Sequence, residues 1–148
     1  MNDQDLRELY QEVIINHNKR PCNKGIAGPC SHNADGDNPI CGDRVSVCLN
    51  VNHDTIDNIT FDGEGCAISV ASASIMTKLL KGKSLVWAKK LSSDFQSICT
   101  RSNQDETLLS GQEFEELNLL TSVKHFPARV KCATLAWHTL DDALRCKK

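Results

Sequence analysis

The sequence lacks the features that would direct the chain to a membrane or to nucleic acid. Its opening residues, MNDQDLRELY, are acidic and polar, so they do not resemble a secretory signal peptide. No apolar run approaches the roughly 20 residues that are needed to span a bilayer. The formal net charge is only −2, and no segment carries the sustained basic stripe that is typical of nucleic-acid binding. We therefore expect a cytoplasmic protein that binds neither membranes nor nucleic acid.

The chain also lacks internal repeats, linkers and low-complexity segments that would divide it. With 148 residues, of which 40% are hydrophobic, it is long enough for one buried core and too short for two ordinary domains. We therefore expect residues 1–148 to form a single domain.

Cysteine, in contrast, is abundant, with eight residues in the chain. An even number in a small secreted protein would predict a disulfide framework, but nothing in this sequence indicates export. In a reducing compartment, cysteines serve more often as metal ligands, reactive thiols or small apolar filler. The sequence therefore predicts free thiols rather than structural disulfides.

Hydrophobic spacing predicts a helix followed by a small sheet in the first half of the chain. Apolar residues recur at helical spacing over residues 6–14, and Pro21 stops that helix. Residues 21–39 are rich in Gly, Pro, Asn and Asp, which is typical of a loop with at most one short edge strand. Residues 44–51 alternate between apolar and polar and, with residues 55–61 after a turn, predict a β-hairpin.

The second half predicts several helices, at residues 66–82, 84–99, 110–123 and 127–146, with a polar loop at residues 100–107. Helix, small antiparallel sheet and then several helices is the order of an α+β fold, in which the helices pack against the sheet. Trp87 and Trp137 are expected in the core. The run from Ala71 to Ser74 indicates close helix packing rather than a catalytic serine, since no partnership of a histidine with an aspartate accompanies it.

The hairpin is expected to bring distant residues together. If Val51 pairs with Thr55, the apolar residues of both strands meet on one face. The same register sets Asp43 opposite Gly63, so that Cys66 returns to within a few residues of the turn NPICGD, residues 38–43.

Three cysteines and one aspartate lie where the chain is least regular. Cys41 and Asp43 occupy the Pro/Gly turn, and Cys132 lies in the first turns of the last helix. Cys66 starts a helix, where free N–H groups and the helix dipole favour thiolate. Three sulfurs and one carboxylate oxygen are ligands that Zn²⁺ accepts. Spacing alone leaves a metal site, a nucleophile beside a carboxylate and an ordinary turn all open, because the chain has no Cys-x-x-Cys pair.

The sequence gives weaker indications of a role at this site for the neighbouring cations, the histidines and the other cysteines. Three thiolates and one carboxylate would leave a divalent site with a net charge of −4 + 2 = −2, which Arg129 and Lys131, both just before Cys132, could offset. None of the five histidines is a convincing fourth ligand, although His125 is kept in reserve. The other cysteines are expected to act as small apolar side chains: Cys22, Cys30, Cys48, Cys99 and Cys146.

Several stretches of the sequence resemble the NifU/IscU-like iron–sulfur cluster assembly family, and specifically its SufU branch: LYQEVIINHNKRPCNKG, NPICGD, GEGCAISVASASIMT and FPARVKCATLAW. The resemblance covers essentially the whole chain and implies a small antiparallel sheet against helices. It also implies that four residues meet at one metal site: Cys41, Asp43, Cys66 and Cys132. Scaffold-type members carry a histidine directly before the third cysteine, where this chain has Lys131. The segment between Cys66 and Cys132 is also longer than in the scaffold branch.

The SufU branch implies a zinc-dependent sulfurtransferase. Such a protein takes persulfide sulfur from a SufS-type, pyridoxal-phosphate-dependent cysteine desulfurase onto Cys41, and it supplies downstream iron–sulfur assembly proteins. The alternative within the family is a scaffold on which a 2Fe–2S cluster is built and passed to apo-proteins. A third interpretation is a protein whose zinc only stabilises the fold.

Overall fold

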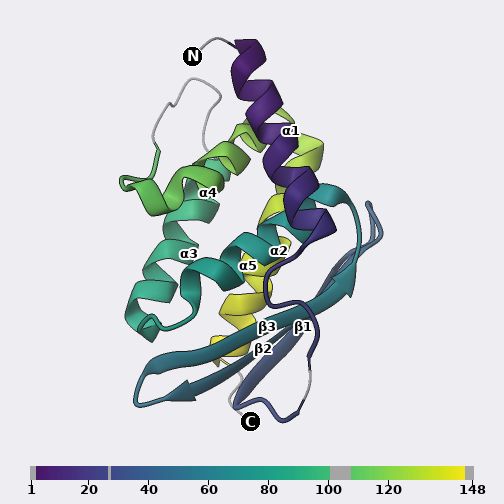
Figure 1. The fold of residues 1–148 in the computed structure, drawn as a ribbon. Coiled ribbons are helices and arrows are strands. Elements are labelled where there is room, and N and C mark those ends of the chain that lie inside the picture. The colour runs from purple at the N-terminus through teal and green to yellow at the C-terminus, as the bar shows by residue number, and fades with distance from the viewer. Residues whose placement is uncertain (1–2, 27, 101–107, 146–148) are drawn as a thin grey trace.

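The computed structural model describes residues 3–26, 28–100 and 108–145. Its elements are α1 (Asp3–Lys19), β1 (His32–Asn38), β2 (Asp43–Asn52), β3 (Thr55–Glu64), α2 (Ala67–Leu80), α3 (Leu85–Thr100), η1 (Gln112–Phe114), α4 (Glu115–Leu120), η2 (Thr121–His125) and α5 (Pro127–Arg145). The strands form one antiparallel sheet in the order β1-β2-β3, and the helices lie on one side of it (Figure 1). The predicted α+β fold is confirmed.

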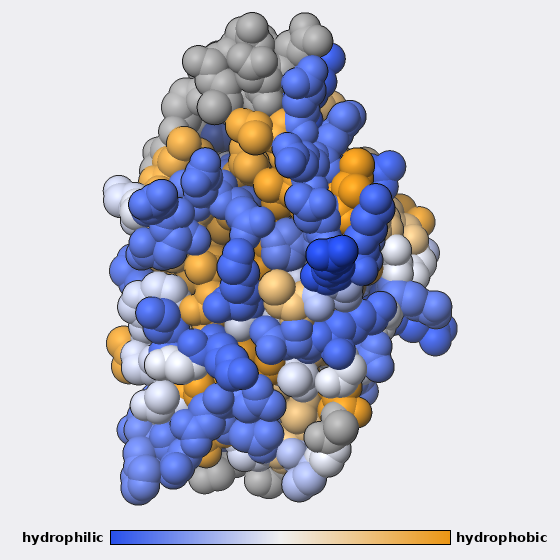
Figure 2. All heavy atoms as spheres, in the orientation of Figure 1, coloured by the Kyte–Doolittle hydropathy of each residue, from blue (hydrophilic) through white to orange (hydrophobic). Residues whose placement is uncertain are grey.

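Helices α2 and α5 form the layer that contacts the sheet, with α5 against β1 and β2 and α2 against β3. Helices α1 and α3 pack on this layer from outside, α1 on α2 and α3 on α5. On the face seen in Figure 2, hydrophilic side chains predominate and apolar ones show in patches between the helices. Among the described residues, no helix combines the length and the apolar character that crossing a bilayer would require.

The hairpin forms as expected, but its register differs from the predicted one by two residues. The turn at His53–Asp54 has positive φ at both positions and pairs Asn52, rather than Val51, with Thr55. A bulge in β3 adds the second shift, because Asp57 is an extra residue between the pairs Val51–Ile56 and Asn50–Asn58, so that Val47 lies opposite Phe61. Because side chains alternate with period two, a shift of two residues keeps the same apolar face on the core.

The edge strand β1 is longer than the sequence predicted. It spans seven residues, although HNADGDN has no apolar alternation. Close packing against α5 explains it, because a Cβ at Gly36 would lie 2.1 Å from Thr139 Oγ1. The predicted helix at residues 110–123 is also wrong in detail, since the structure divides it into η1, α4 and the start of η2. The predicted loop lies, apart from Thr100, outside the described residues.

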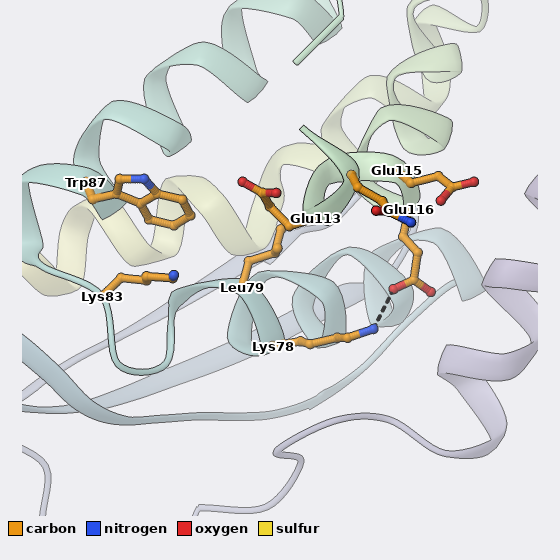
Figure 3. Close-up of a pocket in the computed structure, with 8 residues that line it drawn as sticks. Lys78, Leu79, Lys83, Trp87, Glu113, Glu115 and Glu116 are labelled. Atoms are coloured by element: carbon orange, nitrogen blue, oxygen red, sulfur yellow. Dashed lines mark hydrogen bonds and ion pairs between the residues drawn. The ribbon is translucent and has the colours of Figure 1, made fainter. Parts of the chain in front are cut away.

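The core lies between the sheet and the layer formed by α2 and α5. Trp137 is fully buried there, with its ring 5.1 Å from that of Phe95. Trp87 lies only at the edge of the core, so the prediction for it is confirmed in part. Its ring stacks on Phe114 at 6.0 Å, and Lys83 Nζ lies 5.2 Å from the ring centroid (Figure 3). The core thus extends from the sheet through the layer of α2 and α5 to α3, which carries Phe95.

A disulfide joins Cys30 and Cys48, so the expectation of free thiols is wrong at these two positions. Cys30 precedes β1 and Cys48 lies in β2, and their Cα atoms are 5.4 Å apart. The segment before β1 folds along β2, where Ser31 N–H donates to the Leu49 carbonyl at 2.9 Å. The remaining described cysteines are free: Cys22, Cys41, Cys66, Cys99 and Cys132. Cys146 lies outside the described residues.

We expect reduction of this disulfide to lower the free energy of unfolding by about 3 kcal/mol, because the crosslink restricts the unfolded chain. Urea denaturation of the wild type with and without reductant measures the difference. Cys30→Ala is the matched control, because it should unfold identically under both conditions, near the midpoint of the reduced wild type. An unfolding midpoint of the wild type that is the same with and without reductant would show that the crosslink does not stabilise the protein in solution.

Candidate metal centre

The NPICGD turn joins β1 to β2 and sets two of the predicted residues at one end of the sheet. Cys41 N–H donates to the Asn38 carbonyl at 3.3 Å and closes a tight turn through Pro39. Asp43 begins β2, pairs with Asn38 across the ladder and is 1% exposed. The thiol of Cys41 is therefore half-exposed on the turn, while the carboxylate of Asp43 is buried behind it.

Cys66 lies at the N-terminus of α2, as predicted, and its backbone contacts Asp43 directly. Cys66 N–H donates to Asp43 Oδ1 at 2.7 Å. A Cβ at Gly65 would lie 2.4 Å from the same oxygen, so only glycine permits this approach. The shifted hairpin register brings about the contact, because Val45, and not Asp43, lies opposite Gly63.

Cys132 approaches the same point from α5, where it is fully buried. Its Sγ lies 3.3 Å from Cys41 Sγ. One ligand atom from each of Cys41, Asp43 and Cys132 lies within 4.8 Å of the others. Cys66 Sγ lies outside this tight group but is 4.0 Å from Asp43 Oδ2. The structure thus brings three of the four predicted residues together and sets the fourth beside them.

The donor set and its spacing fit a tetrahedral metal ion. Zinc with sulfur ligands at about 2.3 Å separates two such sulfurs by about 3.8 Å. The observed separations of 3.3 Å between two sulfurs and 4.0 Å between sulfur and oxygen are of that size. Soft thiolates select zinc or iron–sulfur clusters over magnesium and calcium, which prefer oxygen. These residues can therefore hold a thiophilic ion after small side-chain rotations.

Electrostatics around Cys132 favour a protonated sulfur when no metal is bound. Burial raises the pKa of the Cys132 thiol, and hydrogen bonds with Cys41 and Asp43 raise it further. A metal ion must displace this proton, so binding releases protons to solvent. A hydrogen bond to Cys132 and the nearby charges of Cys132, Cys66 and Cys41 raise the pKa of the exposed Arg129 guanidinium. Arg129 is therefore a cation whose charge is stabilised by these three sulfurs.

Other predicted residues lie away from this point. Lys131 lines a groove of about 430 Å³ between β1 and α5, which Asn38 and Asp142 also line. His125 lies in an apolar groove of about 520 Å³ beside Tyr10. Over residues 3–26, 28–100 and 108–145, no histidine joins the ligand cluster, so the structure does not support His125 as a metal ligand. Cys99 is buried apart from the cluster, and burial raises the pKa of its thiol to about 12.

The Ala/Ser run on α2 has a histidine partner after all. His17 Nδ1 lies 2.7 Å from Ser74 Oγ, and His17 Nε2 lies 2.9 Å from Glu116 Oε2. Ser74 is fully buried, and its oxygen also accepts the Cys22 N–H at 2.7 Å, so no substrate can reach it. Lys78 Nζ forms an ion pair with Glu116 Oε1, the other carboxylate oxygen, at 2.8 Å (Figure 3). The network joins α1, α2 and α4, and the prediction of close packing holds, although a histidine paired with a glutamate, rather than with an aspartate, accompanies the run.

Two polar residues near the sulfurs were not singled out from the sequence. Tyr10 on α1 has a raised pKa, first because of burial and then because of the nearby charge of Cys66. Asn38 is 4% exposed, and its amide reaches Asp43 and Cys132. Asn38 stands within the NPICGD motif, so its position was visible in the sequence, but its contact with the last helix was not.

Comparison with known proteins gives a consistent result. Residues 9–133 match the family model described as the NifU-like N-terminal domain. The zinc-dependent sulfurtransferase SufU of Bacillus subtilis is 39% identical over 137 residues, which cover 93% of this chain and 90% of that protein. An iron–sulfur cluster assembly scaffold protein IscU of Streptococcus pyogenes is 37% identical over 146 residues, 95% of this chain and 85% of the relative.

Solved structures share the fold over almost the whole chain. A putative iron–sulfur cluster assembly scaffold protein for the SUF system from Fervidobacterium islandicum superposes with a TM-score of 0.77 at 28% identity. The match covers 97% of this chain and 99% of that one. A nitrogen-fixing NifU-like protein from Brucella abortus has the same TM-score of 0.77 at 18% identity, which shows the fold alone.

Proposed function

The chain belongs to the NifU-like N-terminal domain family, and on that basis we propose that it is a zinc-dependent sulfurtransferase of iron–sulfur cluster assembly. It accepts sulfur from a SufS-type cysteine desulfurase in the cytoplasm, and residues 1–148 act as one domain. The observation that carries the proposal is the convergence of Cys41, Asp43 and Cys132, with Cys66 beside them.

The proposed metal ligands are Cys41, Asp43, Cys66 and Cys132. Zinc, when bound, holds the cysteine sulfurs as thiolates, the form that attacks a sulfur–sulfur bond. Asp43 supplies the one hard oxygen among soft donors and is therefore the easiest ligand to displace. The Cys66 N–H donates to Asp43 Oδ1 at 2.7 Å, which leaves Asp43 Oδ2 for the metal.

The transfer itself is a thiol–disulfide type exchange at Cys41. The Cys41 thiolate attacks the outer sulfur of the persulfide on the desulfurase cysteine. A new sulfur–sulfur bond forms on Cys41, the bond within the donor persulfide breaks, and the desulfurase cysteine leaves as a thiolate. Cys41 then carries the persulfide to a downstream iron–sulfur assembly protein.

The surface around Cys41 supports contact with a protein partner. Ile40, directly before Cys41, is 79% exposed, and Phe126, directly before α5, is 61% exposed. Because Ile40 is next to Cys41 in the chain, a partner that reaches the Cys41 thiol would cover this apolar side chain. Arg129 adds an exposed cation beside the sulfurs, which suits an incoming anionic persulfide.

A second candidate function is a scaffold for a 2Fe–2S cluster, because the chain is 37% identical to a protein named as an IscU scaffold. The same thiolates could ligate such a cluster. A third, a purely structural zinc site, predicts no response from a desulfurase.

Metal analysis together with a desulfurase assay separates these functions. We expect protein purified without oxygen to contain one zinc per chain and no visible chromophore. We also expect it to stimulate alanine release from cysteine by a matched desulfurase over multiple turnovers. Iron with acid-labile sulfide would support the scaffold instead. Zinc without any stimulation would leave only the structural role.

A further inference from the structure

Asn38 contacts three of the four residues of the candidate metal centre. It ends β1, and its backbone carbonyl accepts the Cys41 N–H at 3.3 Å. Its side-chain Nδ2 lies 3.4 Å from Asp43 Oδ2 and 3.9 Å from Cys132 Sγ. An amide nitrogen has two N–H donors, so both acceptors can be served at once. No other chemistry of the centre uses this residue.

The buried amide has a defined orientation. With the amide reversed, its oxygen would face a carboxylate oxygen and a sulfur, and lone pairs would oppose lone pairs. With the nitrogen inward, each contact pairs a donor with an acceptor. A buried polar group with such partners is stable, whereas one without them is costly. The surroundings of Asn38 therefore require donors on this side chain.

The contacts of Asn38 complete the support of the Asp43 carboxylate. Cys66 N–H holds Oδ1 at 2.7 Å, and the Asn38 amide approaches Oδ2, so both oxygens are restrained. A carboxylate oxygen has lone pairs enough to accept this hydrogen bond and still ligate a metal ion. Asn38 also links this carboxylate to Cys132 on α5, which is 94 positions away in the sequence.

We propose that Asn38 is a positioning residue of the metal centre, whose amide holds Asp43 Oδ2 and Cys132 Sγ at ligating separation before the metal ion binds. The proposal rests on the proposed function to the extent that a metal ion is what these residues hold. Partners of metal ligands typically contribute 10–100-fold to metal affinity. Replacement of the amide should therefore weaken metal binding without removing a ligand.

The test compares Asn38→Leu with Asn118→Leu. Leucine has the same branching and number of side-chain heavy atoms as asparagine but no donor, and the control variant carries the same increase in volume. Asn118 is a matched control, because its part-buried amide lies outside the ligand cluster. Its Nδ2 donates to the Leu109 carbonyl and its Oδ1 accepts the Leu109 N–H, each at 2.9 Å. Zinc affinity is measured by competition with a chromophoric chelator, and ligand geometry by the visible bands of the Co²⁺-loaded protein.

We expect Asn38→Leu to bind zinc about 10–100-fold more weakly and to change the intensity of the cobalt bands. Asn118→Leu should change neither, even where it lowers the melting temperature. Zinc affinity and cobalt bands equal to wild type in Asn38→Leu would overturn the proposal. A wild type that binds no zinc would instead overturn the proposed function, so the two failures are distinct.

A measurement on the unchanged chain keeps the inference testable if Asn38→Leu does not fold. The side-chain amide protons of Asn38, assigned by NMR in the wild type, should shift when zinc is added. Those of Asn118 should stay in place. An Asn38 amide that does not respond to zinc would contradict its contact with the ligands.

Discussion

The zinc-loaded Cys41→Ala protein is expected not to stimulate the desulfurase, so that the rate of alanine release equals that of the desulfurase alone. Cys41 lies half-exposed on the turn between β1 and β2, whereas Cys132 is fully buried on α5. A turn can move toward a partner with little loss of packing, while a buried helix residue cannot. Loss of the turn sulfur therefore removes the acceptor itself. Alanine release under multiple turnovers measures the effect.

Three other cysteine variants are the controls for this experiment. Cys48→Ala, Cys99→Ala and Cys146→Ala should leave stimulation largely intact, because none of these sulfurs belongs to the proposed ligand set. Mass spectrometry of the wild type after reaction should find one added sulfur atom, on the peptide that contains Cys41. Full stimulation by zinc-loaded Cys41→Ala would refute sulfur transfer through this residue.

Cys66→Ser is expected to lose zinc and to unfold at a markedly lower temperature. A ligand that binds only the folded state stabilises it, by about 4 kcal/mol when free zinc is 1,000-fold above its Kd. In a chain of this size, that corresponds to a melting temperature lower by roughly 10 °C. Zinc content by elemental analysis and Tm by calorimetry measure the two effects.

Chelation supplies the control for Cys66→Ser. Removal of metal from the wild type should lower its Tm to nearly that of the variant, while the variant itself should not respond to chelator. Asp43→Ala should behave differently, because it keeps three sulfurs and opens one position to water, so zinc is bound less selectively. Full zinc occupancy and an unchanged Tm in Cys66→Ser would show that the proposed ligand set is wrong.

Local patterns were enough to predict most of the elements. Apolar spacing identified α1, α3 and α5, and alternation identified β2 and β3, because each of these elements buries one regular face. The length of its Ala- and Ser-rich run identified α2, which is buried on several sides. β1 was underestimated because close contact of Gly36 with α5, and not its own pattern, makes it a strand. The register was wrong because turn geometry and a bulge decide it, while the apolar pattern decides only which face is buried.

The candidate centre was predictable to a different degree at each residue. The hairpin alone placed Cys66 near the turn with Cys41 and Asp43. Only the family resemblance placed Cys132 there, because no local pattern determines where α5 crosses the sheet. The disulfide between Cys30 and Cys48 was missed for the same reason, since it depends on how a loop without periodicity folds along β2.

The position of Cys132 on α5 has a consequence for the order of events during synthesis. Cys132 meets Cys41 across 91 positions, and α5 is the last described element to leave the ribosome. The 66 residues from Cys66 to Cys132 take roughly 3 to 13 seconds to translate. Throughout that interval, the nascent chain presents two thiols and a carboxylate without the third sulfur. Selection of the metal ion must therefore be completed after translation of the centre, when the final helix closes over a set of donors that is already exposed.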